Sequence, residues 1–338
     1  MTNAGEGQQR ILAAGAYAEG EIEARQQGES GDEPPGAPEP RQQAPKQEKQ
    51  RGLWGDAWLE LRRKPLFIIG SVIILLLVAI SIFPGFFAPG DPNAQNLTLA
   101  RQGPSADAPF GYDSIGRDIY TRVIHGARAS IVVGVLATML TVAIGSLVGL
   151  FAGYFGGKTD SFLARFAEIF LGLPFVLGAI VILSVFNAGI QGAPGTIRIM
   201  LQVILTIGVL AWPISMRIMR SAAIAAKQQD YVNAAKALGA SHTRIIFKHV
   251  LPNCLAPVMV YATIALGQFV GLEATLSYLG LGLQYPVVSW GMMISDSQQF
   301  IISTPHMLLF PAGFLVITVL AFVMIGDAVR DALDPKQR

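Results

Sequence analysis

The segment Gly156-Gly157-Lys158-Thr159 has the residue types that end a phosphate-binding loop. In such a loop, backbone N–H groups and a lysine hold the phosphates of a nucleotide. The complete motif also needs a glycine five residues before Gly157, where Ala152 stands. The motif follows a β-strand, whereas this segment follows a long apolar run. We therefore predict that the chain itself binds no nucleotide.

The sequence also lacks residues at the spacing that a metal site or a catalytic site needs. Its four histidines are scattered, and His242 and His249, which are seven residues apart, have no Cys, Asp or Glu at ligand spacing. Cys254 is the single cysteine, so no disulfide can form within the chain, and we interpret it as a small buried apolar residue. No Ser-His-Asp set, pair of carboxylates or HExxH motif occurs. We predict no metal, no cofactor and no catalytic residue on this chain.

The composition indicates a membrane as the surroundings of most of the chain. Of the 338 residues, 52% are hydrophobic and 14% are charged, whereas a soluble domain has about 25% charged residues. A chain this apolar needs a bilayer as its solvent. The net charge of +2 gives no reason to expect nucleic acid as a partner, because the basic residues gather at the ends of apolar runs.

Six apolar runs are long enough to span a bilayer, which takes about 20 residues of helix. They predict an all-α polytopic membrane protein with six transmembrane helices. Pro174 and Pro213 lie inside the third and fourth runs, where membrane helices tolerate a proline as a kink. We place the spans at residues 66–87, 129–151, 166–186, 199–219, 254–276 and 307–326.

The regions around these spans differ in composition and charge. Residues 1–52 are rich in Gln, Glu, Gly and Pro, which predicts a disordered tail. Residues 53–126 hold the first span and an extracytoplasmic segment, 127–327 hold the other five spans, and 328–338 form a second tail. Six Lys or Arg residues lie at the end of the fourth span and before the fifth, from Arg217 to Lys248, and none lies in 277–306. Because basic residues gather on the cytoplasmic side, we expect both termini in the cytoplasm.

Small residues recur along the second span. Gly145, Gly149 and Gly153 follow one another at intervals of four residues, which places them on one face of a helix. Small residues at this spacing let two helix backbones approach closely. We therefore expect these glycines at a helix–helix contact, the alternative being that glycine is simply common in membrane helices.

Glu273 is the ionisable residue closest to the membrane interior. A charge there is costly and marks a functional candidate. Gln268, Glu273 and Ser277 add polar groups to one end of the fifth span, and the pair four residues apart shares a helix face. We expect these three residues to line the route of a transported substrate. The alternative is that they face a neighbouring helix and hold the bundle together.

The stretch between the fourth and fifth spans is too long for a simple connector. Its Ala-rich part, 221–238, has high helix propensity, and Gly239 supplies a left-handed end. Ser241 then caps a second helix over 242–250, which Pro252 ends. A helix–glycine–helix elbow of this kind suits docking into a groove of another protein. An amphipathic hairpin lying on the lipid surface is the alternative.

The residues of this elbow also carry a resemblance to a known family. Asn233-Ala234-Ala235, Gly239 and the later Leu251-Pro252 resemble the EAA loop of ABC importer permeases, which carries a coupling helix that fits a cleft on the ATPase subunit. Asn233 departs from the pattern, since a glutamate is usual there, and this affects a salt bridge rather than docking. The resemblance implies an ATPase-docking site made of Asp230, Asn233, Ala234, Ala235, Gly239, Ala240, Leu251 and Pro252.

Two further stretches indicate which branch of the family the chain resembles. Residues 110–130 resemble the segment before the second span in the oligopeptide/dipeptide/nickel branch of that family, with Tyr112 where threonine is more frequent. Residues 276–284, together with Ser289-Trp290-Gly291, resemble the loop before the sixth span in the same branch. The resemblance extends from about residue 53 to residue 334 and is specific to the C-type permease subunit.

This resemblance implies a fold, a function and a set of partners. The fold would be a type I ABC importer permease bundle (MetI-like) in a bacterial cytoplasmic membrane. The chain would form half of the pathway of an ATP-driven, binding-protein-dependent importer for di- or oligopeptides or, within the same branch, nickel chelates or glycosides. Its partners would be a homologous B-type permease, two ATPase subunits that hold ATP and Mg, and an extracytoplasmic substrate-binding protein.

Two other classes of function compete with this interpretation. A membrane enzyme should place convergent polar residues within its spans, and this sequence does not. A membrane scaffold that transports nothing is suggested only by the long N-terminal tail, which lies outside the resemblance. Copurification of an ATPase subunit would separate a transporter subunit from both.

Overall fold

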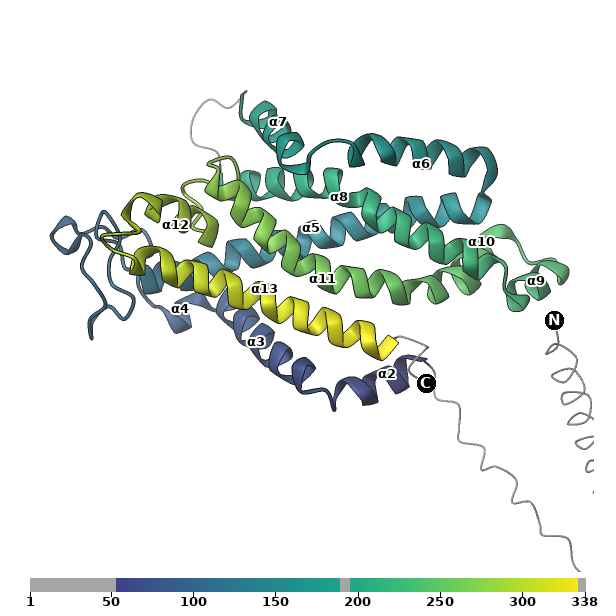
Figure 1. Cartoon of the computed structure of the whole chain (residues 1–338), viewed down its shortest axis with the longest axis horizontal. Coiled ribbons are helices and arrows are strands. Elements are labelled where there is room, and N and C mark those ends of the chain that lie inside the picture. Colours follow the sequence, from purple (N-terminus) through teal and green to yellow (C-terminus); the bar gives the residue numbers. More distant parts are fainter. Residues whose placement is uncertain (1–52, 189–194, 334–338) are drawn as a thin grey trace, which may run out of the picture. The chain divides into compact units, whose positions relative to one another are not determined.

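The computed structural model describes residues 53–188 and 195–333. The tail expected at 1–52 lies outside these ranges, and so do the last five residues of the tail expected at 328–338, whose residues 328–333 instead continue the last helix, α13. Within them the regular elements are helices, apart from one isolated β-bridge (Figure 1). The helices are α2 (Leu53–Leu61), α3 (Pro65–Ile82), α4 (Pro84–Phe87), α5 (Ile119–Phe155), α6 (Gly157–Leu171), α7 (Phe175–Ala188), α8 (Thr196–Lys227), α9 (Asp230–Ala237), α10 (His242–Arg244), α11 (Leu251–Tyr278), α12 (Trp290–Ser297) and α13 (His306–Leu333), with 3-10 turns at Leu97–Leu99 and Gln298–Phe300 and a π-helical turn, η2, at Ile245–Val250.

The membrane-spanning helices agree with the sequence in number, but the spans expected over 66–87 and 166–186 are each divided into two helices. Among the described residues, five helices are long and apolar enough to cross a membrane, and the pair α6 and α7 adds a sixth when it is counted as one span. The span over 166–186, expected as one helix kinked at Pro174, is instead two helices bent by 85°. The break lies between Gly172, which ends α6, and Pro174, whose ring removes a backbone N–H from the ladder.

The elbow between α8 and α11 also differs from its sequence-based outline. The helix expected over 221–238 is divided, because α8 continues to Lys227 and α9 begins at Asp230. Pro252 does not end the second helix, since α10, η2 and α11 follow one another without a break. The π-helical turn immediately before Pro252 widens the hydrogen-bond ladder, and Pro252 itself lies in the first turn of α11, where a missing N–H is tolerated.

Helices α5 and α8 run parallel and form the closest contact of the bundle. A Cβ atom placed on Gly145 would lie 2.5 Å from the carbonyl oxygen of Trp212, and one on Gly153 would lie 2.7 Å from that of Arg220. A Cβ on Gly149 would collide with the carbonyl oxygen of Met216. Only a hydrogen atom fits at these three glycines, so the two backbones touch along three successive turns.

The other helices pack around this pair. One apolar cluster joins α5, α7, α8 and α11 in the middle of the bundle, and another joins α3, α5, α12 and α13 toward the start of α5. We call the end of the bundle where α5 and α8 finish the elbow end, and the other the opposite end. At the opposite end, Trp290 is buried and its indole N–H donates to the carbonyl of Val123 at 2.9 Å.

Candidate partner-docking site

The elbow, residues 228–250, turns on a left-handed glycine. Gly239 has a φ of +77°, as the sequence predicts. Its N–H donates to the carbonyl of Lys236 at 2.9 Å, and the N–H of Ala240 donates to that of Ala235 at 3.0 Å, the two bonds of a Schellman motif. Ser241 then caps α10 by accepting from the N–H of Arg244. The turn is therefore fixed by its own backbone.

The inner face of the elbow is anchored on the bundle. Val232 and Ala235 of α9 are buried, and so are Ile245, Ile246 and Val250 of the π-helical turn. They share one apolar cluster with the last turns of α5 and α8 and the start of α11, through Leu150, Tyr154, Met219, Ala223, Ala226, Cys254 and Val258. The position of the elbow is thus set by where α5 and α8 end.

Several apolar side chains of the elbow are exposed to solvent. Leu238, beside the glycine turn, is 88% exposed, and Tyr231 and Phe247 are also exposed. Three large apolar groups exposed within one short segment are available for contact with another protein. Of the residues assigned to docking by resemblance, Asp230, Asn233, Ala234, Gly239 and Pro252 are exposed, Ala240 and Leu251 are half-buried, and Ala235 faces the bundle.

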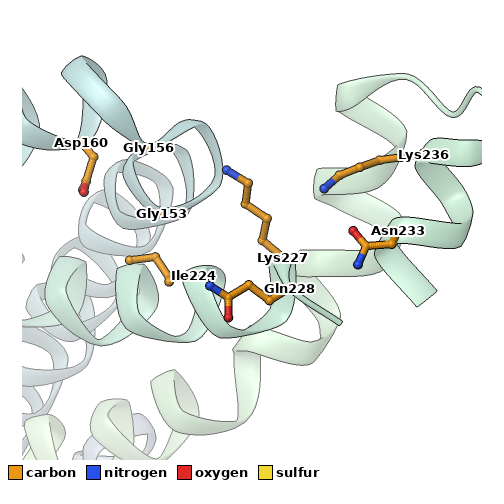
Figure 2. Close-up of a pocket in the computed structure, with 8 residues that line it drawn as sticks. All are labelled: Gly153, Gly156, Asp160, Ile224, Lys227, Gln228, Asn233 and Lys236. Carbon is orange, nitrogen blue, oxygen red and sulfur yellow. The ribbon is translucent and has the colours of Figure 1, made fainter. Parts of the chain in front are cut away.

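A cavity of about 470 Å³ lies between the elbow and the helix ends (Figure 2). Asp160, from the first turn of α6, forms a salt bridge there with Arg220 of α8, in which Nη2 and Oδ2 are 2.6 Å apart. Lys227 lies over the ring of Tyr154, with its ammonium group 5.7 Å from the ring centroid. The residues that line the cavity are Gly153, Gly156, Asp160, Ile224, Lys227, Gln228, Asn233 and Lys236.

Glu273 is buried inside the bundle at the opposite end. Its Oε1 accepts a 2.7 Å hydrogen bond from the hydroxyl of Ser277, and that hydroxyl accepts one from the N–H of Leu283 at 2.8 Å. The hydroxyls of Ser130 on α5 and Ser289 before α12 lie around the same carboxyl. The hydrogen bonds of Ser277 therefore tie the end of α11 to the loop that follows it.

This burial separates the three residues expected along a substrate route. Glu273 and Ser277 are buried together, whereas Gln268 is exposed on another side of α11. The positions of Glu273 and Ser277 favour the alternative in which this pair holds the bundle together. The partners from α5 and from the loop could not be recognised from α11 alone, because they are distant in sequence.

An ionic cluster at the opposite end was not singled out in the sequence. Arg117 Nε lies 2.5 Å from Asp113 Oδ2, and Arg117 also reaches Asp296 at 3.5 Å. Arg122, almost wholly buried, donates to the carbonyl of Pro92 at 3.2 Å. The cluster holds the segment before α5 against the bundle. Its one local signal was the spacing of four residues between Asp113 and Arg117.

Two family models match the chain on either side of residues 105–144. Residues 145–338 match the family of the binding-protein-dependent transport system inner membrane component. Residues 52–104 match the N-terminal TM domain of oligopeptide transport permease C.

Curated relatives are similar over most of their length. The dipeptide transport system permease protein DppC of Alkalihalophilus pseudofirmus is 40% identical over 84% of this chain and 90% of its own. The oligopeptide transport system permease protein OppC of Bacillus subtilis is 39% identical over 86% of this chain and 92% of its own. The glutathione transport system permease protein GsiD of Escherichia coli is 35% identical over 86% of this chain and 93% of its own.

Solved structures share the fold at lower identity. The MetNI methionine ABC transporter, in inward-facing crystal forms, matches with TM-scores of 0.51 and 0.50 at 22% and 21% identity. Each match covers 62% of this chain and 95% or 96% of the solved one. At this identity the likeness supports the fold of the bundle.

The burial of Ser277 predicts its chemical protection. In a Cys254→Ala background, Ser277→Cys in the detergent-purified chain should react with a small water-soluble thiol reagent far more slowly than Tyr285→Cys, because Tyr285 is 67% exposed. Thermal unfolding of both variants serves as the control for intact folding. If the two folded variants were labelled at the same rate, position 277 would be accessible to water, and Ser277 could line a substrate route.

Proposed function

The chain belongs to the family of binding-protein-dependent transport system inner membrane components, and we propose that it is the C-type permease subunit of an importer for di- or oligopeptides. Permeases of this family work with ATPase and substrate-binding partners and are not enzymes. The observation that carries the proposal of a peptide substrate is the 39–40% identity to dipeptide and oligopeptide permeases over at least 84% of the chain.

The proposed assembly has a homologous B-type permease, two ATPase subunits and an extracytoplasmic substrate-binding protein. This chain would supply one half of the pathway, while ATP and Mg would be bound by the ATPase subunits. Support comes from the lack of a phosphate-binding loop in the sequence and from the single helical bundle among the described residues. The 470 Å³ cavity and the exposed apolar elbow add a surface suited to another protein.

We place the elbow end on the cytoplasmic side of a bacterial cytoplasmic membrane, with both termini there. The excess of Lys and Arg around the elbow supports this orientation. The ends of the described chain support it too, since Lys64 before α3 hydrogen-bonds Asp331 near the end of α13 at 3.4 Å. The far end of α3 leads to α4, where the carbonyl of Phe87 accepts from Tyr120 at the start of α5. Lys64 and Asp331 thus lie toward the elbow end.

The outer face of the elbow would dock the ATPase subunit through the residues that resemble the EAA loop. Leu238→Asp puts a charge at the most exposed apolar position of the turn without touching the bundle. We expect it to abolish copurification of the ATPase subunit with a tagged chain, while the purified variant keeps its thermal stability. Ile302→Asp, an equally exposed position at the opposite end (96% exposed), is the matched control and should retain the ATPase. If the Leu238→Asp variant still copurified with the ATPase subunit, the elbow would not be part of the interface.

Transport by the assembled complex tests the proposed substrate. The tagged chain, isolated from its host together with its partners and placed in proteoliposomes, should drive uptake of labelled di- or oligopeptides when ATP and the binding protein are supplied. Uptake should cease with a non-hydrolysable ATP analogue. Uptake of nickel chelates or glycosides, with no uptake of peptides, would contradict the proposed peptide substrate. An isolated complex that contains no ATPase subunit would contradict the proposal that the chain is a transporter subunit.

A further inference from the structure

A buried carboxyl group without a counter-ion lies at the opposite end of the bundle. The side chain of Glu273 is 0% exposed and lies within the span predicted at 254–276. Among the described residues, Glu273 takes part in no salt bridge. Its Oε1 accepts the hydrogen bond from Ser277, whereas its Oε2 is buried without a hydrogen-bond partner. Since buried polar atoms are almost always hydrogen-bonded, this oxygen atom needs an explanation.

A second buried oxygen atom without a partner belongs to Ser130 of α5. Ser130 is 0% exposed, and its hydroxyl has no hydrogen-bond partner either. The hydroxyls that act on the Glu273 carboxyl are those of Ser130, Ser277 and Ser289. The hydroxyl of Ser277 is already committed, because it donates to Oε1 and accepts from the N–H of Leu283. The two unpartnered oxygen atoms, from α11 and α5, can therefore satisfy each other.

The elements that pack against this end of α11 supply no charge to neutralise a carboxylate. The groups that act on the Glu273 carboxyl are serine hydroxyls, and no charged side chain of the described residues is among them. A buried charge without a partner is strongly unfavourable in a membrane span, and one hydrogen bond offsets only part of that cost. The charged side chains and histidines at this end of the packed helices, none of which acts on Glu273, are Arg122, His125 and Arg128 of α5, Arg198 of α8, Asp296 of α12 and His306 of α13.

The packing around the carboxyl favours a proton over a metal ion as the counter-charge. A Cβ atom placed on Gly282 would lie 2.6 Å from Ser277 Oγ, and one on Gly291 would lie 2.5 Å from the carbonyl oxygen of Ala274. Among the residues that the structure describes, no group of His, Cys, Asp and Glu side chains could hold a metal ion. A proton needs no such ligands and no added space.

We propose that Glu273 is an uncharged positioning residue, which carries a proton on Oε2 and donates it in a hydrogen bond to the hydroxyl of Ser130. Its carboxyl then bonds in two directions, since Oε1 accepts from Ser277 while Oε2–H reaches α5. This joins α11 both to α5 and, through Ser277 and Leu283, to the loop that leads to α12. Release of the proton to water would leave an unpaired buried charge and weaken the joint. The inference goes beyond the proposed function and depends on neither the peptide substrate nor the ATPase subunit.

Infrared spectroscopy of the full-length chain in detergent reports this proton directly. At neutral pH we expect the carbonyl-stretching band of a protonated carboxylic acid, and Glu273→Gln should lose it. Glu60→Gln is the matched control, because Glu60 pairs with Lys64 at 3.1 Å and its replacement should remove a carboxylate band instead. If Glu273→Gln removed a carboxylate band and no acid band, Glu273 would be ionised and the proposal would be wrong.

The acceptor of the proposed hydrogen bond is tested by Ser130→Ala. The acid band should remain and shift to a higher frequency, because the carboxyl O–H loses its acceptor. Ser297→Ala is the matched control and should leave the band in place, since Ser297 is a buried serine that bonds to the carbonyls of Met293 and Met307. Both variants keep Glu273, so this measurement decides the matter even if Glu273→Gln does not fold. An unshifted band in folded Ser130→Ala would overturn the bond to α5.

The pH dependence of unfolding separates a held proton from a purely structural contact. At neutral pH the folded chain would hold a proton that the unfolded chain has released, so the free energy of unfolding falls as the pH rises. Relative to Glu273→Gln, the unfolding constant of the wild-type chain should rise about tenfold for each pH unit above neutrality. Parallel pH profiles for the two proteins would show that folding retains no proton at this site, and the proposal would be overturned.

Discussion

Along three turns, α5 and α8 approach so closely that Gly145, Gly149 and Gly153 leave room for no side chain. This contact fixes the two longest neighbours of the bundle relative to each other. Their last turns supply Tyr154 and Met219 to the cluster that holds the elbow. A larger residue at one of these glycines would push the backbones apart, because a packed interior has no spare volume. The elbow would then lose its packing on the last turns of α5 and α8.

From the elbow, a continuous helical path leads through the bundle. The helix runs from His242 through the π-helical turn to Tyr278, 37 residues in all, which is roughly 55 Å at 1.5 Å per residue. Near its far end, Ser277 links Glu273 to the following loop, and Val270 packs against Gly134 of α5. A displacement at the elbow therefore has a stiff connection to the opposite end. This connection matches what a permease requires when its energy source is a separate ATPase subunit.

The features that the sequence predicted are those that depend on local pattern. Apolar runs predicted the number of spans, the four-residue spacing agrees with the helix contact at Gly149, and a lone glycine after an Ala-rich helix predicted the left-handed turn at Gly239. Pro174 predicted a kink but not the full break of 85°, and the uninterrupted path through Pro252 could not be predicted, since proline ends one helix and is tolerated in another according to its neighbours. The surroundings of Glu273 come from three separate segments, and periodicity within α11 carries no information about them.

The packing of the elbow on the ends of α5 and α8 makes it a rigid extension of these two helices. Spin labels at Phe155→Cys and Lys248→Cys in a Cys254→Ala background would report the distance between the end of α5 and the elbow, both positions being exposed. The measurement is made on the assembled transporter without nucleotide and with ATP, and a label pair between Lys248→Cys and the ATPase subunit confirms that the state has changed. The distance from position 155 to position 248 should be the same in both states. A distance that shifts with ATP would show that the elbow moves independently of the helices that hold it, and that it is not rigid.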